Sequence, residues 1–199
     1  MSFRTHLRDT IERAANPRHK FGHQPRLYTL SQQIGSGLSY DDDVVYAAIW
    51  LHDLGVFIGV RPEDPAALAQ WDCAGYILDR APAILAESGF PAAKIPAVVE
   101  VIRTHQSHST PTTLEGSIVR DADILEQLGA VACMRTISKL DSDTRFHTFT
   151  SVRDALQKQL DTLPQKLQLP ASHKLAEPRI RILREFLAAL AAETGADLY

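Results

Sequence analysis

Residues 44–55 read VVYAAIWLHDLG, an apolar run that ends in a histidine and an aspartate. Apolar residues fall on every side of a helix with about 3.6 residues per turn, so the run predicts a helix buried in the centre of the fold. Asp41, Asp42 and Asp43 precede it, where the helix dipole favours negative charge. The run is too short to cross a bilayer, which needs about 20 apolar residues.

The rest of the chain shows the helical period and only weak strand signals. Helices are expected over residues 3–16, 24–34, 66–88, 94–105, 112–140, 150–163 and 178–194. Thr112 and Glu115 have the spacing of a capping box at the start of one of them. The predicted class is all-α, a single domain over residues 1–199 with a core at about 17–140 and C-terminal helices at about 150–194 packed on it.

Composition narrows the class of protein. Of the 199 residues, 45% are hydrophobic and 23% charged, which is typical of a globular protein. The net charge is −3 and no basic stripe occurs, so duplex nucleic acid and membranes are not expected as partners. Cys73 and Cys133 form no CxxC pair, which argues against a thiolate zinc site and for buried or partly buried thiols in a reducing compartment. With no secretory signal at the N-terminus, the expected location is the cytoplasm.

His52 and Asp53 are the chemically informative pair. Burying an imidazole and a carboxylate is costly unless each finds a partner, and a metal ion can serve both. The alternative is a histidine at a helix end with a solvated aspartate. Three further residues favour the metal: His23 before one expected helix, His105 at the end of another, and Asp123 inside an apolar frame. Aspartate is unfavourable in a helix interior, so the presence of Asp123 there suggests a functional role.

This ordered set resembles the HD-domain superfamily of metal-dependent phosphohydrolases. The similarity extends to Ala47–Gly55, to Gly89-Phe90-Pro91 with the helix that ends at His105, to Asp121–Leu125, and to Arg179 before the final helix. It covers about residues 17–194, and within the superfamily it is similar to a subgroup of small bacterial hydrolases. The resemblance implies an HD-type helical bundle with additional N- and C-terminal helices.

By this resemblance the metal ligands are His23, His52, Asp53 and Asp123. Imidazole and carboxylate suit one divalent ion among Mn, Fe, Co, Ni and Zn, which would activate water against a phosphate ester. The implied substrate is a nucleotide or a similar small phosphate ester. Family members often have a charged residue just after the His-Asp pair, whereas Leu54–Phe57 is apolar here. A second metal is therefore in doubt, although His105 and His108 are candidate ligands for one.

The catalytic residues follow from the same comparison, whereas the cations follow from the need for positive charge near a phosphate. Arg26 lies three positions after His23, and a solvated charge is the alternative for Lys20 and Arg103. His105 and Asp53 are the candidate catalytic residues, and Asp121 is expected to support a ligand. Arg26, Lys20 and Arg103 are the candidate cations for substrate binding. Two other functions stay open: a metal- or ligand-binding sensor domain without hydrolysis, and an HD-like di-iron oxygenase or hydratase. The oligomeric state does not follow from the sequence.

Overall fold

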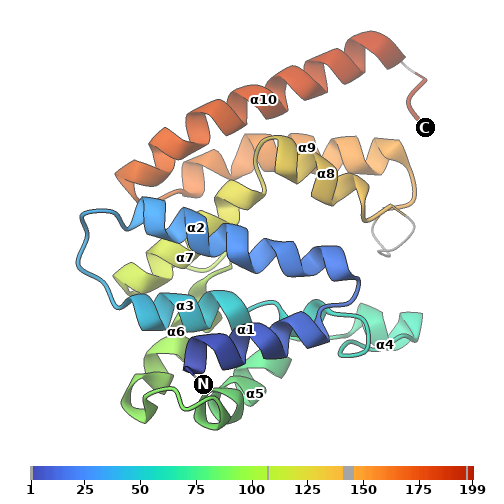
Figure 1. Cartoon of the computed structure of the whole chain (residues 1–199). Helices are drawn as coiled ribbons and strands as arrows, with labels where there is room; N and C mark the ends of the chain where they lie inside the picture. The colour runs from blue at the N-terminus through green and yellow to red at the C-terminus, as the bar shows by residue number, and fades with distance from the viewer. Residues whose placement is uncertain (1, 107, 141–145, 196) are drawn as a thin grey trace. The chain divides into compact units, whose positions relative to one another are not determined.

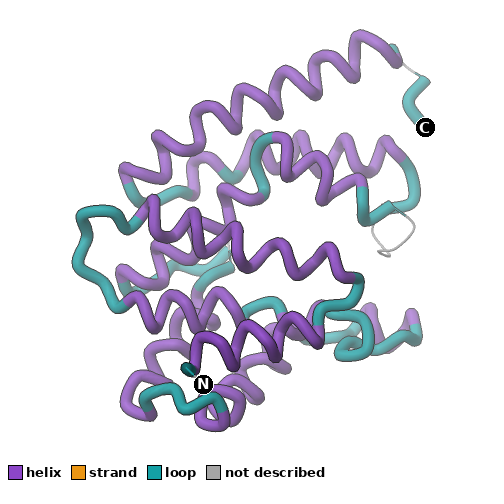
Figure 2. The backbone as a smooth tube through the Cα atoms, viewed as in Figure 1, coloured by secondary structure: helices purple, strands orange, loops and turns teal. Residues whose placement is uncertain are grey.

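The computed structural model describes residues 2–106, 108–140, 146–195 and 197–199. It divides into two compact units, residues 1–122 and 123–199, which are described separately. The described residues are helical and contain no strand, only an isolated bridge between Ile58 and Arg61 (Figure 2). The predicted all-α class is confirmed, and the single domain stays a prediction.

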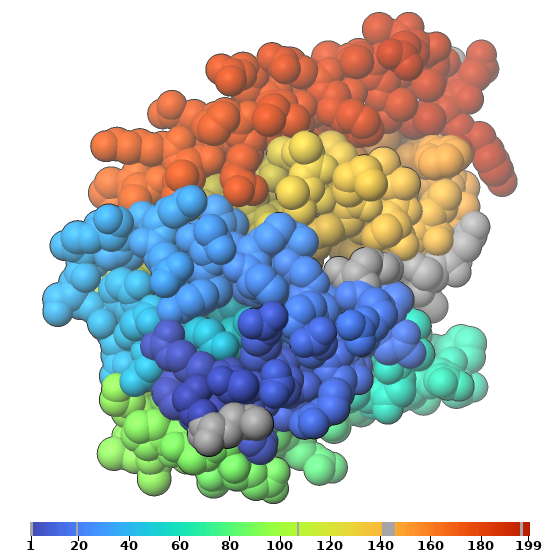
Figure 3. Space-filling model, in the orientation of Figure 1, coloured from blue at the N-terminus to red at the C-terminus, as the bar shows by residue number. Residues whose placement is uncertain are grey.

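The first unit is built around α3, Asp42–Leu51. It contacts α1 (Phe3–Ala14), α2 (His23–Ile34), α5 (Cys73–Glu87) and α6 (Ile95–Thr104) (Figure 1). Every residue of α3 from Val44 to Leu51 is buried, as the apolar run predicts. Figure 3 shows the blue atoms of α1 and α2 covering much of α3 on the face in view.

Short helices connect these elements: η1 (Arg18–Gly22), η2 (Leu54–Val56), α4 (Pro65–Ala69) and η3 (Ala92–Lys94). The second unit contains α8 (Ala130–Ile137), α9 (Phe149–Thr162), η4 (Pro164–Lys166) and α10 (Pro170–Thr194). In it α8, α9 and α10 pack on one another. The boundary between the units falls within α7 (Leu114–Glu126).

Charged side chains hold the start of α3. Asp41 caps the helix by accepting from the N–H groups of Asp43 and Val44. Arg4 on α1 donates to Asp42 at 2.8 Å and to Asp43 at 2.6 Å. The hydrogen bond from Arg4 holds the pKa of the Asp43 carboxyl below its ordinary value. These contacts tie α1 to the first turn of the central helix, whose last turn carries His52.

Three expected helices differ from the structure. Residues 66–88 form two helices, because the Asp72 side chain accepts from the Gly75 N–H and starts α5 afresh. Residues 112–140 form α7 and α8, which are separated at Gly129, where φ is +81°. The last helix begins at Pro170 rather than at 178, since proline is tolerated in a first turn. Between α7 and α8 the buried residues Leu125, Leu128 and Ala132 keep the helical spacing across the boundary, so periodicity alone could not place it.

The predicted capping box of Thr112 and Glu115 is also wrong. The neighbouring Thr113 supplies the cap, because its hydroxyl accepts from the Gly116 N–H at 3.1 Å. The Glu115 carboxylate instead accepts from the Asp41 N–H at 2.9 Å. The Thr112 hydroxyl donates to Glu100 at 3.2 Å. Glu115 therefore connects α7 to the N-cap of α3 rather than closing its own helix.

Candidate metal centre

His52 lies at the C-terminal end of α3 and its side chain is 1% exposed. Its Nδ1 atom is 2.8 Å from the carbonyl oxygen of Ile49. A carbonyl oxygen can only accept, so Nδ1 carries the hydrogen and Nε2 keeps its lone pair. That Nε2 atom is buried and makes no hydrogen bond with the residues that the structure describes. The backbone of α3 therefore fixes the tautomer and ring direction that a metal ligand needs.

His23 and Asp53 meet His52 from neighbouring segments. Asp53 Oδ2 is 3.4 Å from His23 Nε2 and 3.5 Å from His52 Nε2. The two imidazole rings have centroids 5.4 Å apart. His23 comes from the first residue of α2, whereas Asp53 follows α3 directly and begins the turn into η2. Two helices and one turn thus bring together three residues that the sequence predicted as ligands.

This cluster fits a divalent metal ion. One ligand atom from each of His23, His52 and Asp53 lies within 4.8 Å of the others. Both histidines are buried and the Asp53 side chain is 29% exposed, so the group has a protected side and an accessible one. Two imidazoles and a carboxylate suit a first-row divalent ion and would leave coordination positions for other ligands.

His105 joins the same region from the end of α6. Its ring centroid is 5.0 Å from that of His52, edge to face. Its Nδ1 atom is 2.5 Å from the carbonyl oxygen of Ile102, so this tautomer is fixed in the same manner. His105 is buried at 6% exposure and is not part of the three-residue metal group. The catalytic role of His105 stays a prediction.

Asp123 is the first residue of the second unit, and its role as fourth ligand stays a prediction. It is half-buried, and the Gln127 side chain donates to its carboxylate at 3.0 Å. Asp121 has no exposed surface, so it does not face solvent. Both carboxylates therefore lie in protein surroundings, although they project from different sides of α7.

The three predicted cations differ in their surroundings. Lys20 donates to the carbonyl oxygen of Val56 at 3.0 Å, on the segment that follows Asp53. The Arg26 guanidinium covers Gly22, where an added Cβ would lie 2.8 Å from Nη1. Arg103 pairs with Glu100 on α6, and its side chain is 62% exposed. Lys20 and Arg26 lie on the segments that carry the cluster, whereas Arg103 has the surroundings of a surface residue.

The remaining predictions concern surface and core residues. His108, His147 and His173 are exposed, and His6 is partly exposed. The side chain of His19 is outside the described part of the structure. Trp50 is 4% exposed and belongs to the core, while half-buried Trp71 donates its indole N–H to Gly55 O at 2.8 Å.

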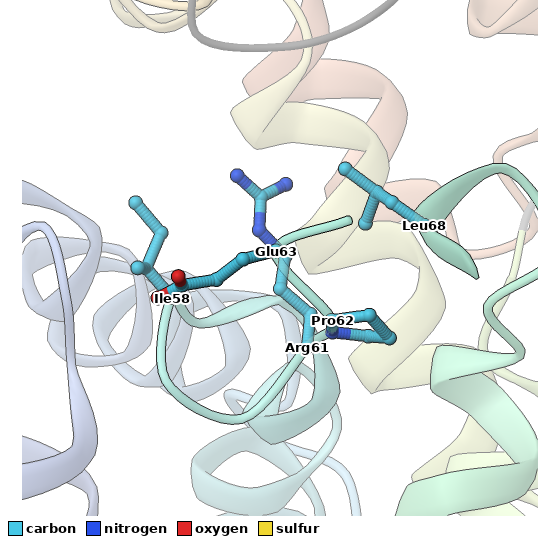
Figure 4. A pocket seen from close by; sticks show the side chains of 5 residues that line it. All are labelled: Ile58, Arg61, Pro62, Glu63 and Leu68. Carbon is cyan, nitrogen blue, oxygen red and sulfur yellow. The ribbon is translucent and has the colours of Figure 1, made fainter. Parts of the chain in front are cut away.

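Sequence reasoning missed Arg61, which lines a pocket of about 190 Å³ on the loop after the His-Asp pair (Figure 4). The pocket is lined by Ile58, Arg61, Pro62, Glu63 and Leu68. The available signal was that Arg61 is the first cation after Asp53 and stands between a glycine turn and a proline.

Comparison with solved structures finds proteins of the same fold. YpgQ of Bacillus subtilis in complex with ADP is 19% identical, with 98% of this chain and 96% of that one covered and a TM-score of 0.71. A predicted HD superfamily hydrolase from an uncultured Thermotogales bacterium is 26% identical, with coverages of 97% and 91% and a TM-score of 0.61. An HD-superfamily hydrolase of Bacillus thuringiensis is 18% identical, with coverages of 98% and 97% and a TM-score of 0.68. No protein-family model and no curated protein matches the chain.

Proposed function

We propose that this chain is an HD-superfamily, metal-dependent phosphohydrolase of a nucleotide or a similar small phosphate ester, and its similarity to solved HD-superfamily hydrolases supports the proposal. The observation that carries the proposal is the group of His23, His52 and Asp53, with ligand atoms within 4.8 Å of one another. The ADP in the YpgQ structure supports a nucleotide as the substrate class.

His23, His52 and Asp53 would hold the metal, and we propose Asp123 as a fourth ligand from α7. A bound divalent ion lowers the pKa of its water and neutralises charge on a phosphoryl group. Apart from this, the protein's own contribution is to fix the ligands. The Ile49 carbonyl orients His52, and the buried apolar face of α3 holds that carbonyl in place.

His105 is the proposed general acid or base. Its Nδ1 hydrogen is held by the Ile102 carbonyl, so any proton that moves to or from substrate does so at Nε2. The ring is packed against His52 rather than exposed to solvent. A buried imidazole next to a metal ligand is placed to protonate a leaving alkoxide or to accept a proton from an attacking water.

The proposal also includes the partner and the cellular location. The partner is a small phosphate-containing substrate, and the expected location is the cytoplasm. No helix in the described part of the chain is both long and apolar enough to cross a membrane.

A phosphate-release screen over nucleotides, with Mn²⁺, Co²⁺, Ni²⁺ and Zn²⁺ added to metal-stripped protein, tests this function. Hydrolysis that requires a metal and disappears in Asp53→Ala is the expected result. Metal binding without hydrolysis of any phosphate ester would instead favour a sensor domain. Two bound irons with an optical band would favour an oxygenase.

A further inference from the structure

The loop between η2 and α4, residues 57–64, is fixed to the segment that carries Asp53. The Val56 N–H donates to the Asp53 carbonyl at 3.0 Å, and the Arg61 N–H donates to the Phe57 carbonyl at 3.0 Å. Phe57 is 1% exposed and anchors the loop in the core. Two hydrogen-bonded turns therefore connect Asp53 with Arg61, so the loop is positioned before any ligand arrives.

Arg61 is a cation without an internal counter-charge. Its side chain makes no hydrogen bond or ion pair within the part of the chain that the structure describes, although the residue is half-buried. In Figure 4 its guanidinium extends beyond the loop, whereas the Glu63 carboxylate turns toward Ile58. A partly desolvated guanidinium with no carboxylate bound to it favours an anion from solution.

The size and walls of the pocket limit what this anion can be. Pockets for whole small ligands measure about 300–1,000 Å³. This one measures about 190 Å³, so it suits one group of a ligand rather than all of it. The planar fork of a guanidinium matches the oxygen atoms of a phosphate and can bind two of them at once.

We propose that Arg61 binds a phosphate group of the substrate other than the one attacked at the metal centre. The pocket is then an anion subsite, and it favours nucleotides with more than one phosphate over monophosphates. Arg61 thereby supplies positive charge that the apolar segment Leu54–Phe57 lacks. This proposal rests on the phosphohydrolase function and names the substrate class for the same site.

The test compares ADP with AMP for the metal-loaded full-length protein and its Arg61→Gln variant. We expect KM for ADP to rise about 10- to 150-fold, since one charge-assisted hydrogen bond contributes about 1.5–3 kcal/mol and each step of about 1.4 kcal/mol is a factor of ten. KM for AMP and kcat for both nucleotides should stay within about twofold. Calorimetric binding of α,β-methylene-ADP should weaken by the same factor as KM for ADP rises, which gives a readout without turnover.

Two matched variants sharpen the comparison. Glu63→Gln removes the competing carboxylate of the pocket and should tighten binding of α,β-methylene-ADP. Arg80→Gln removes a cation on α5 whose guanidinium lies 5.6 Å from the Tyr76 ring. This variant should leave KM for ADP and for AMP unchanged. Equal effects of Arg61→Gln on ADP and AMP, or unchanged binding of the analogue, would overturn the subsite. If wild-type protein hydrolyses neither ADP nor AMP, analogue binding still decides the role of Arg61, and the phosphate-release screen decides the proposed function separately.

Discussion

His52 and His105 are held in the same way at the ends of two packed helices. Each Nδ1 atom lies within hydrogen-bond distance of the carbonyl oxygen three residues earlier, at 2.8 Å from Ile49 and 2.5 Å from Ile102. The rings are 5.0 Å apart, and α3 packs on α6. Both imidazoles therefore have one tautomer selected by the backbone, with the ring hydrogen on Nδ1. The Nε2 atom of His52 is buried and makes no hydrogen bond with the described residues. The two histidines differ in their neighbours: His52 belongs to the metal group with His23 and Asp53, whereas His105 does not.

Removal of His105 should reduce turnover and spare the metal. Because His105 is not part of the metal group, His105→Gln is expected to keep most bound metal and lose about 10²–10⁴-fold in kcat. Elemental analysis and steady-state kinetics on one preparation measure both quantities. Turnover and metal content both at the wild-type level would show that the residue only packs against His52.

Removal of a proposed ligand, unlike removal of His105, should reduce the amount of bound metal. His52→Ala and Asp53→Ala are expected to lose bound divalent metal, because each takes one of three converging ligand atoms from an open site. Metal content per chain is the measurement. His173→Ala, at an exposed position on α10, is the matched control and should retain metal. Full metal content in both site variants would rule out this centre.

Asp123 and Asp121 can be separated by conservative changes. They are two positions apart, about 200° around an α-helix, so they do not point at one ion. Asp123→Asn should abolish metal-dependent hydrolysis, whereas Asp121→Asn should weaken activity about 10–100-fold and also lower stability, since Asp121 is fully buried. Activity, metal affinity and thermal unfolding are measured for each. A silent Asp123→Asn beside an inactive Asp121→Asn would show that the two roles are exchanged.

The sequence predicts the centre of this protein better than its connections. Residues 44–51 are apolar on all sides, and only a helix in the centre of the fold buries all of them. The position of α3 and the unusual His52-Asp53 pair at its end were therefore predictable. The starts of α5 after Asp72 and of α8 after Gly129 depend on a single side-chain cap and on one positive φ angle, and the spacing of apolar residues does not reveal either. The approach of His23 and His105 to His52 depends on packing between helices, so it required the family resemblance rather than periodicity.

Substitution of Gly55 should disturb both the packing of α5 and the binding of metal. A Cβ there would lie 2.7 Å from the Cys73 carbonyl oxygen, a backbone atom that cannot rotate away. Gly55→Ala should therefore displace the turn after Asp53, lower stability by about 1–3 kcal/mol and weaken metal binding. Urea unfolding and metal titration measure the two effects. In the control Gly75→Ala, the added Cβ meets only the Asp72 side chain, so a lost helix cap should lower stability with metal affinity unchanged. Equal metal affinities in the two variants would contradict the coupling.

The Arg4–Asp43 ion pair should make stability depend on pH in the acid range. The hydrogen bond from Arg4 lowers the pKa of Asp43 below its ordinary value of 3.8, so the folded state favours its charged form. Such a group stabilises the fold at pH values above 3.8, and this contribution is lost as pH falls through the lower, folded-state pKa. Both side chains are 33% exposed, so solvent screening limits the effect to about 1 kcal/mol. The free energies of unfolding of wild type and Asp43→Asn in urea should differ by this amount at neutral pH and converge as pH falls below the folded-state pKa of Asp43. Asp79→Asn, at an exposed position on α5, should match wild type throughout. A constant difference between wild type and Asp43→Asn from neutral to acid pH would show that the Asp43 charge does not stabilise α3.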